Sequence, residues 1–265
     1  MASVLVTGGA GKLGREVVAR LARRGHHVRS LTHMAPASPL DGIEVDGIEV
    51  MVGDLGTGAG LKAALDGIEV VIHAASNSQQ AQAVDIDGTR HLLAAAQAHD
   101  RSPHIIYVSI VGVDRSEAPY YKAKYAAERL VQQSGLPWSI LRATQFHNFI
   151  LDILRSLGID TQPEVAVPDG VRLQSIEIGE VADRLVAIAE GAPLRQVEEM
   201  GGPQILSMEE MAAIYLRAQG LPTRVHSEPL HSPLFDGFRR GAILTPDHAT
   251  GVMTWETYVS HLSAG

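Results

Sequence analysis

Three glycines near the N-terminus, Gly8, Gly11 and Gly14, have the spacing of a phosphate-binding turn. The apolar residues 4–6 before them predict a β-strand, and residues 13–24 after them have the apolar periodicity of a helix. In such a turn the first glycine allows the tight bend, the second lets phosphate approach the backbone, and the third lets helix and strand pack closely. The helix start adds N–H groups and partial positive charge. The sequence therefore predicts a dinucleotide-binding turn formed by Gly8, Gly11, Lys12, Leu13 and Gly14.

The end of the second predicted strand, residues 27–31, bears on the choice between NAD and NADP. Proteins that prefer NAD usually place an acidic residue there, which binds the ribose 2′-hydroxyl. Here the strand is followed by Thr32 and His33, and the next acidic residue is Asp41. Without a carboxylate, nothing repels the 2′-phosphate of NADP. We therefore expect NADP(H) to be favoured over NAD(H), with the 2′-phosphate bound by His33, Lys12, Arg15 or Arg29.

A second pair of residues with chemical potential, Tyr120 and Lys124, stands four positions apart on a predicted helix, residues 121–133. Residues at this spacing share one face of a helix. The pair follows the fifth predicted strand, residues 105–109, so both side chains are expected near the edge of the sheet where ligands bind.

The elements that position these residues alternate between strand and helix along the first half of the chain. This alternation predicts an α/β fold with a Rossmann-type, doubly wound parallel sheet. Besides the segments already named, strands are expected at residues 50–52, 70–74 and 138–141, and helices at 61–65 and 86–98.

After about residue 150, prolines punctuate shorter elements, with helices expected at residues 180–190, 208–218 and 254–262. Ser207 is expected to cap the middle helix. We therefore expect a dinucleotide-binding domain over residues 1–150 and a smaller C-terminal substrate lobe of mixed α/β structure over residues 151–265, the two packed as one unit.

The composition excludes several other classes of function. The net charge of −8 argues against a nucleic-acid surface, and the absence of cysteine excludes disulfides, thiolate nucleophiles and cysteine-bound metals. The twelve histidines show no metal-ligand spacing, so no metal is expected. No apolar run reaches membrane-spanning length. We expect a cytoplasmic protein that binds a small-molecule substrate, no nucleic acid and no membrane, and that can form a homo-oligomer.

A series of short motifs runs in order along most of the chain. In the first half it comprises Thr7-Gly8-Gly9-Ala10-Gly11-Lys12-Leu13-Gly14, Gly53-Asp54-Leu55, His73-Ala74-Ala75-Ser76, Asp87-Gly88-Thr89, Tyr107-Val108-Ser109, Tyr120-Tyr121-Lys122-Ala123-Lys124 and Leu136-Pro137-Trp138-Ser139-Ile140-Leu141-Arg142. In the second half it continues with Gln174, Glu180-Val181-Ala182, Gly201-Gly202-Pro203 and Leu206-Ser207. In this order the motifs resemble those of the short-chain dehydrogenase/reductase superfamily, in its atypical NmrA-like branch. The resemblance implies a Rossmann-type fold that binds NAD(P).

The resemblance also assigns cofactor contacts beyond the glycine turn. Asp54 corresponds to the acid that contacts adenine in the family, and Leu55 follows it directly. Ala74, Ala75 and Ser76 are expected to line the cofactor where the fourth strand ends.

In the superfamily, a Tyr-x-x-x-Lys pair works in acid–base catalysis, so the resemblance implies Tyr120 as the proton donor and Lys124 as its partner and a contact of the nicotinamide ribose. The usual third member is a Ser or Thr just past the fifth strand. Ser109 lies near this place, although Ile110 can equally occupy it, and Asp85 stands where a fourth member is usually Asn.

Two points stay open from the sequence. The doublet Tyr120-Tyr121 does not say which ring points inward. The polar stretch 144–148 either contacts nicotinamide or substrate, with Gln145 as the expected cofactor contact, or forms a connection between the lobes.

The resemblance implies an NAD(P)H-dependent oxidoreductase that reduces a small apolar carbonyl, quinone or conjugated double bond. The alternative is a dinucleotide-binding, redox-sensing regulator without turnover. A sugar-nucleotide epimerase is less favoured, because Asp85 and Ile110 depart from that pattern.

Overall fold

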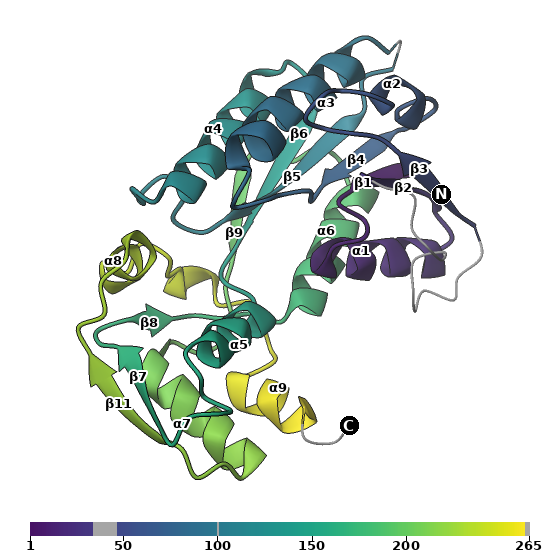
Figure 1. Ribbon diagram of the computed structural model, residues 1–265. Coiled ribbons are helices and arrows are strands. Elements are labelled where there is room, and N and C mark those ends of the chain that lie inside the picture. The colour runs from purple at the N-terminus through teal and green to yellow at the C-terminus, as the bar shows by residue number, and fades with distance from the viewer. Residues whose placement is uncertain (34–46, 100, 263–265) are drawn as a thin grey trace. The chain divides into compact units, whose positions relative to one another are not determined.

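The computed structural model describes residues 1–33, 47–99 and 101–262 (Figure 1). The chain divides into two compact units. The first comprises Met1–Ser109, Pro119–Arg142 and Val181–Glu198, and the second Ile110–Ala118, Ala143–Glu180 and Glu199–Gly265. The expected division at residue 150 is a single cut, whereas the chain passes between these units several times. Each unit is described by itself below.

A seven-stranded sheet forms the centre of the first unit, in the order β3-β2-β1-β4-β5-β6-β9. β1 pairs in parallel with β2 and β4, as do β2 with β3 and β4 with β5. The order reverses between β1 and β4, and ligands of such sheets bind at the carboxyl ends of the strands at this reversal. The strands are β1 (Ser3–Thr7), β2 (His27–Thr32), β3 (Ile48–Val52), β4 (Val70–His73), β5 (His104–Ile110), β6 (Trp138–Ala143) and β9 (Val197–Met200).

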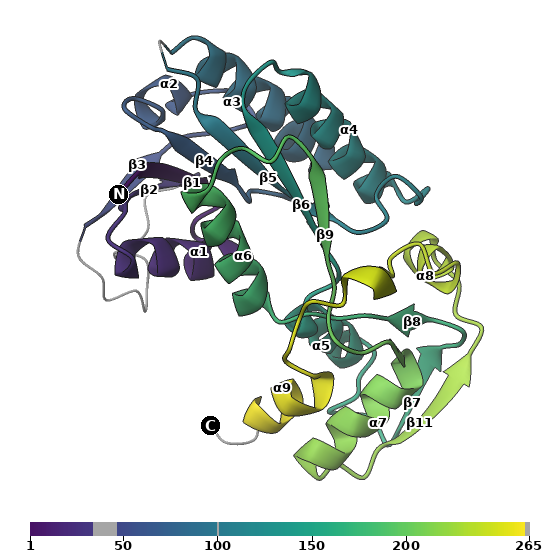
Figure 2. The ribbon, with the colours of Figure 1, turned by 180° about the vertical axis from the view of Figure 1, so that it is seen from behind.

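Helices cover both faces of this sheet, which confirms the doubly wound fold (Figures 1 and 2). α1 (Lys12–Arg23) and α6 (Ile178–Glu190) lie side by side on one face, joined by ion pairs such as Arg20 with Asp183 at 2.8 Å. α2 (Leu61–Ala64), α3 (Gly88–Gln97) and α4 (Pro119–Gln133) cover the other. The expected helix at residues 86–98 begins instead as a π-helical turn, η1 (Gln82–Asp87), which continues into α3.

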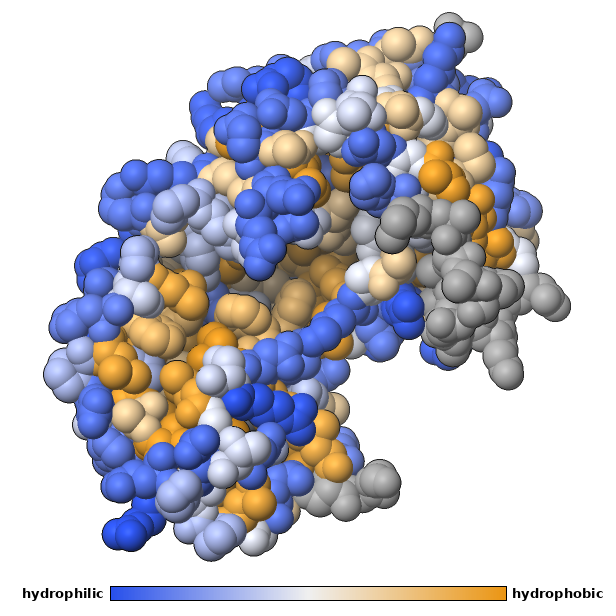
Figure 3. Space-filling model, in the orientation of Figure 1, coloured by the Kyte–Doolittle hydropathy of each residue, from blue (hydrophilic) through white to orange (hydrophobic). Residues whose placement is uncertain are grey.

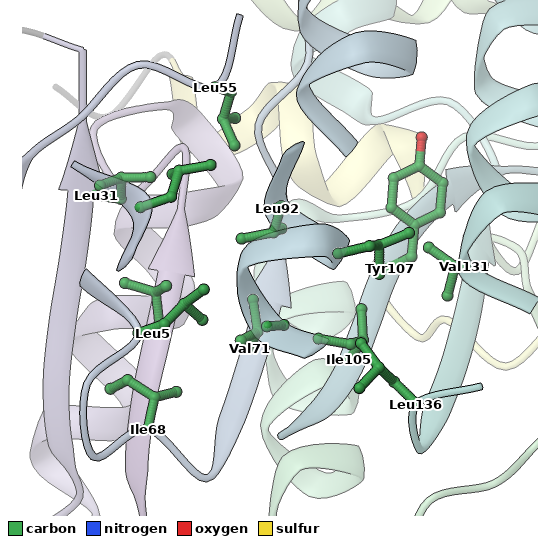
Figure 4. Packing of buried hydrophobic residues seen from close by; sticks show 14 of the residues in the cluster. Leu5, Leu31, Leu55, Ile68, Val71, Leu92, Ile105, Tyr107, Val131 and Leu136 are labelled. Atoms are coloured by element: carbon green, nitrogen blue, oxygen red, sulfur yellow. The ribbon is translucent and has the colours of Figure 1, made fainter. Parts of the chain in front are cut away.

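A hydrophobic core lies between the sheet and the helices α2, α3 and α4 (Figure 4). Leu5, Val71 and Ile105 from neighbouring strands are fully buried, and Leu92 and Val131 pack against them from α3 and α4. Strands that are covered on both faces consist of continuous apolar residues, and this pattern allowed the central strands to be predicted from the sequence. Hydrophilic side chains predominate on the outer surface over α3 and α4 (Figure 3).

The second unit contains short strands and four helices in its described part. β7 (Glu164–Pro168) pairs in parallel with β11 (Arg224–Glu228), and β8 (Arg172–Leu173) pairs antiparallel with β10 (Leu206–Ser207). The helices are α5 (His147–Ser156), α7 (Met208–Gln219), α8 (Pro233–Arg239) and α9 (Trp255–Leu262), with a 3₁₀ turn, η2, at Pro246–His248. Within the residues that the structure describes, no helix has both the length and the apolar character needed to cross a membrane.

Ser207 caps α7, as the sequence predicted. Its hydroxyl accepts a hydrogen bond from the N–H of Glu210 at 3.1 Å, and the Glu210 carboxylate accepts one from the N–H of Ser207 at 2.7 Å. This is a complete capping box, which satisfies two backbone donors at the helix start.

A buried ion pair anchors α4 to β6 within the first unit. The guanidinium of Arg142 donates to both carboxylate oxygens of Glu128, at 2.9 and 2.8 Å. Both side chains are almost inaccessible to solvent. Because α4 also carries Tyr120 and Lys124, this pair fixes the helix that presents them.

We predict that Glu128→Gln lowers the free energy of unfolding by about 3 kcal/mol, because it removes the buried carboxylate charge that accepts from the Arg142 guanidinium through both oxygens. Urea denaturation measures this loss. The matched control is Glu198→Gln, whose pair with Arg184 is partly exposed and is expected to contribute less than about 1 kcal/mol. Equal losses in the two variants would contradict the prediction.

Candidate functional site

The glycine turn predicted from the sequence connects β1 to α1. Gly8 has a φ of +71°, which L-residues rarely adopt, and a Cβ there would lie 2.7 Å from the backbone of Ala75. A Cβ on Gly14 would lie 2.1 Å from the carbonyl oxygen of Gly8. Glycine at these two positions is therefore required by the close packing of the turn, the helix and the residues after β4.

Gly11 is less crowded by the protein's own packing than Gly8 and Gly14. Its φ is −75°, and the only described neighbour within 4 Å of a Cβ at this position would be the Gly8 carbonyl oxygen, at 3.2 Å. Gly11 is also the N-cap of α1, where no side chain caps the helix and the first turn holds no acidic residue. This open backbone at a helix start fits a pyrophosphate, which approaches such N–H groups closely.

The residues expected around the adenosine end lie after β2 and β3. His33 is exposed directly after β2, and Lys12 is exposed at the start of α1. A carboxylate oxygen of Asp54 accepts a hydrogen bond from the N–H of Gly56 at 2.8 Å, and this bond holds the pKa of Asp54 below its ordinary value. The side chain of Leu55 packs into the hydrophobic core.

Arg29 was one of the residues expected to bind a 2′-phosphate, and the structure contradicts this role. Its guanidinium donates to the Glu49 carboxylate at 2.7 Å and to the backbone carbonyls of Ala64 and Asp66 at 2.8 and 2.9 Å. These bonds tie β2 to β3 and to the end of α2. Of the other candidates, Arg15 donates to the carbonyl of Ala10 at 3.0 Å, inside the glycine turn itself.

A short hydrogen-bonded chain links Tyr120 to the segment after β4. The Tyr120 hydroxyl lies 2.7 Å from the hydroxyl of Ser76, which donates to the carboxylate of Asp85 at 2.5 Å. The second Asp85 oxygen accepts the N–H of Asn77 at 3.1 Å. Tyr121 is buried with 4% of its surface exposed, so it is Tyr120 whose hydroxyl reaches this chain.

Lys124 lies buried beside the same carboxylate, with only 4% of its surface exposed. Its Nζ is 3.5 Å from Asp85 Oδ1, donates to the carbonyl of Val108 at 2.8 Å and lies 4.3 Å from the centre of the Tyr107 ring. Burial lowers the pKa of Lys124, and the negative charge of Asp85 opposes this shift. Tyr120 and Lys124 thus lie on the same face of α4. Lys124 contacts the Asp85 carboxylate directly, and Tyr120 is linked to it through Ser76.

A buried histidine that the sequence did not single out supports this arrangement. His73, at the end of β4, lies 2.6 Å from the Thr7 hydroxyl through Nδ1 and 3.0 Å from the Thr89 hydroxyl through Nε2. Thr89 in turn donates to the backbone carbonyl of Asp85 at 2.5 Å. Burial lowers the pKa of His73 to about 3, so the ring is neutral. Through its two nitrogens it links Thr7 at the end of β1 to Thr89, which bonds the backbone of η1.

Two other expected site residues are not brought into these contacts. Ser109 is buried at the end of β5, and its hydroxyl has no hydrogen-bond partner among the described residues. Gln145 belongs to the second unit, so its cofactor contact stays a prediction.

Ala74 and Ala75 lie directly after β4, where the N–H of Ala75 donates to the Thr7 hydroxyl at 3.3 Å. In the described part of the chain, no three His, Asp or Glu side chains gather closely enough to hold a metal ion.

Comparison with known proteins agrees with the interpretation of residues 8–14 as a dinucleotide-binding turn. Residues 8–190 match the model of a family described as NAD(P)H-binding, so the chain belongs to that family. A solved structure of similar fold is an NADPH-dependent quinone oxidoreductase from Escherichia coli in complex with NADPH. It superposes with a TM-score of 0.82 at 20% identity, covering 98% of this chain and 99% of that one.

Two curated relatives carry different kinds of name. A (4-alkanoyl-5-oxo-2,5-dihydrofuran-3-yl)methyl phosphate reductase from Streptomyces griseus is 29% identical over 83% of this chain and 75% of its own length. A photosystem II assembly factor from Trieres chinensis is 30% identical over 57% of this chain. The chain spans about half the length of some of the curated relatives it matches, 48% in this case.

We predict that Gly11→Ala weakens NADPH binding by at least about tenfold and lowers the unfolding midpoint only slightly, because its Cβ enters the space proposed for the phosphates and crowds a single protein atom, the Gly8 carbonyl oxygen at 3.2 Å. Fluorescence titration measures the affinity and thermal melting the stability. Gly191→Ala, at a position with ordinary contacts, is the matched control. Unchanged affinity in Gly11→Ala would show that the phosphates bind elsewhere.

Proposed function

We propose that the protein is an NADP(H)-dependent oxidoreductase that reduces a small apolar carbonyl, quinone or conjugated double bond. The observation that carries the proposal is the Tyr120 hydroxyl, held by Ser76 directly after β4 and placed on the same helix face as the buried Lys124. Gly8 packs against Ala75, which connects the dinucleotide turn to this same segment. The NADPH-bound fold relative and the reductase among the curated relatives support the reaction type.

When bound, a reduced nicotinamide supplies hydride to an electrophilic carbon. Tyr120 then provides the proton for the substrate oxygen. Burial raises the pKa of Tyr120 above 10.0, the hydrogen bond to Ser76 opposes this shift, and the charge of Asp85 adds to it. A raised pKa means that the phenol keeps its proton throughout the neutral range, which suits a proton donor in reduction.

We predict that Tyr120→Phe lowers kcat for carbonyl reduction by about 100-fold or more, the usual contribution of a positioned general acid, and leaves NADPH affinity unchanged. In the unaltered protein, kcat/KM is expected to stay level through neutral pH and to fall only above pH 10, as the phenol loses its proton. Steady-state NADPH consumption measures both. Tyr125→Phe, exposed on the same helix, is the control. Full carbonyl turnover in Tyr120→Phe would exclude the phenol as the acid.

The preference for NADP(H) is part of the same proposal. With Arg29 committed to Glu49, the exposed His33 and Lys12 are the basic side chains that we assign to the 2′-phosphate. The sequence places no acid at the end of β2, where proteins that prefer NAD have one.

We predict that His33→Asp weakens NADPH binding by about tenfold relative to NADH, because a carboxylate repels the 2′-phosphate and offers an acceptor to a 2′-hydroxyl. Parallel titrations with the two cofactors give the ratio. His27→Asp places the same charge at the opposite end of β2 and is expected to leave the ratio unaltered. A ratio that does not move in His33→Asp would contradict this site for the phosphate.

A regulatory role without turnover is the second candidate, favoured by the relative named as an assembly factor. In that case NADPH binds tightly, a panel of quinones, enones and small carbonyls causes no consumption, and a protein partner is recovered with the chain. Steady consumption with any member of the panel supports the reductase instead. A cytoplasmic location and a homo-oligomer remain part of the proposal.

A further inference from the structure

We infer that Ser76 and Asp85 are the positioning residues of Tyr120, and that they hold its hydroxyl in place of the serine or threonine after the fifth strand. This inference deepens the proposed function and rests on it. It comes from a chain of contacts that crosses three elements of the first unit: the segment after β4, the π-helical turn η1 and the helix α4.

The direction of each hydrogen bond in this chain follows from the chemistry of its members. Asp85, paired with Lys124, is an acceptor, so the single proton of the Ser76 hydroxyl is directed to Asp85 Oδ1 at 2.5 Å. Ser76 can then only accept from Tyr120, at 2.7 Å. The phenol proton is therefore oriented by a carboxylate that it does not touch.

Ser109 is the residue that the family pattern offers for this place, and the contacts do not support it. Its hydroxyl is buried and has no partner among the residues that the structure describes, whereas Ser76 is exposed and bonded to the phenol oxygen. An exposed hydroxyl beside Tyr120 is also accessible to a substrate oxygen.

The effect of Asp85 on the protonation of Tyr120 depends on the other groups around the phenol. From η1 the charge of Asp85 acts on the phenol, and from β5 Tyr107 interacts with it electrostatically. On its own helix, the Tyr121 ring packs edge-on against Tyr120, and Lys124 lies one turn further along. Lys124 alone would favour the phenolate, but Asp85 lies 3.5 Å from its ammonium and offsets that charge. Asp85 therefore keeps the phenol protonated, which is the state that starts a reduction.

The balance of the proton step follows from these contacts. As Tyr120 gives its proton to a substrate oxygen, the phenol O–H bond breaks, the substrate O–H bond forms, and the electron pair stays on the phenolate oxygen. The hydride that the proposed activity supplies completes the reduction at carbon. Ser76 can then turn its proton from Asp85 to the phenolate until a proton from solvent restores the phenol.

The experiment is a titration of tyrosinate absorbance, from which the curve of the same protein carrying Tyr120→Phe is subtracted so that only Tyr120 is followed. Once Tyr120 has lost its proton, the Ser76 hydroxyl turns from Asp85 and donates to the phenolate oxygen. Ser76→Ala removes this donor, so the midpoint rises by about half a pH unit. Asp85→Asn removes a negative charge, so the midpoint falls by about one pH unit. The alkaline limb of kcat/KM is expected to move in the same directions.

Matched controls separate this positioning role from a general disturbance. Ser78→Ala alters a serine two residues further along, and Asp87→Asn removes a charge from the same π-helical turn, where Asp87 bonds Gln82 and Arg90 instead. Both are expected to leave the Tyr120 midpoint unmoved. Asp85→Asn can also destabilise the buried Lys124, so thermal melting is recorded, and the exposed Ser76→Ala keeps the test decisive if Asp85→Asn does not fold.

Opposite shifts in Ser76→Ala and Asp85→Asn, with none in the controls, support the inference. No shift in Ser76→Ala, a shift of both in one direction, or a shift in Ser109→Ala instead would overturn it. NADPH titration keeps the two proposals apart. Failure to bind NADPH with the expected tyrosine shifts defeats only the proposed function, whereas NADPH turnover that depends on Tyr120 without those shifts defeats only this inference.

Discussion

The candidate site depends on one buried ion pair, between Asp85 and Lys124. Asp85 has no exposed surface and Lys124 has 4%, so each charge would cost several kcal/mol in isolation. η1 carries Asp85 and α4 carries Lys124, so these two elements must stay close enough for the two charges to remain paired. Because Tyr120 is on α4 and Ser76 bonds Asp85, the same constraint sets the position of the phenol.

A neutral polar chain holds this pair against the glycine turn. Thr7 at the end of β1 contacts His73, His73 contacts Thr89, and Thr89 bonds the Asp85 backbone. With its pKa near 3, His73 adds no charge to this interior and uses both ring nitrogens as contacts. The turn that fits a pyrophosphate and the carboxylate beside the candidate acid are thus connected through the ends of β1 and β4.

The sequence predicted those parts of the fold in which local pattern and tertiary environment agree. The strands at the centre of the sheet are continuous apolar runs because both faces are covered, and Ser207 could be recognised as a cap from the glutamate three residues later. β9 was missed because its sequence, Val-Glu-Glu-Met, lacks such a run. The helix predicted from residue 86 missed most of the π-helical turn, which begins at Gln82 and ends at Asp87.

The site was predictable to the same extent. The glycine positions and the Tyr-x-x-x-Lys spacing are local patterns, but the role of His73 and the bond from Ser76 to Tyr120 join residues far apart in the chain. Arg29 illustrates the converse: its position on β2 suggested a phosphate ligand, yet its guanidinium donates to Glu49 on the neighbouring strand and to backbone carbonyls at the end of α2. Partners across a parallel sheet depend on register, which no single segment specifies.

Dinucleotide binding and catalysis can be separated on physical grounds within this structure. The glycine turn and the start of α1 would serve a sensor as well as an enzyme, because both need only to bind the pyrophosphate. The Asp85–Lys124 pair differs, because binding of the pyrophosphate does not require it. A buried ion pair is often no more stabilising than apolar residues of equal volume, so stability alone gives no reason for charges at this position. Under the proposed function, the pair lies next to Tyr120 and Ser76 and controls the protonation of the phenol that donates the proton.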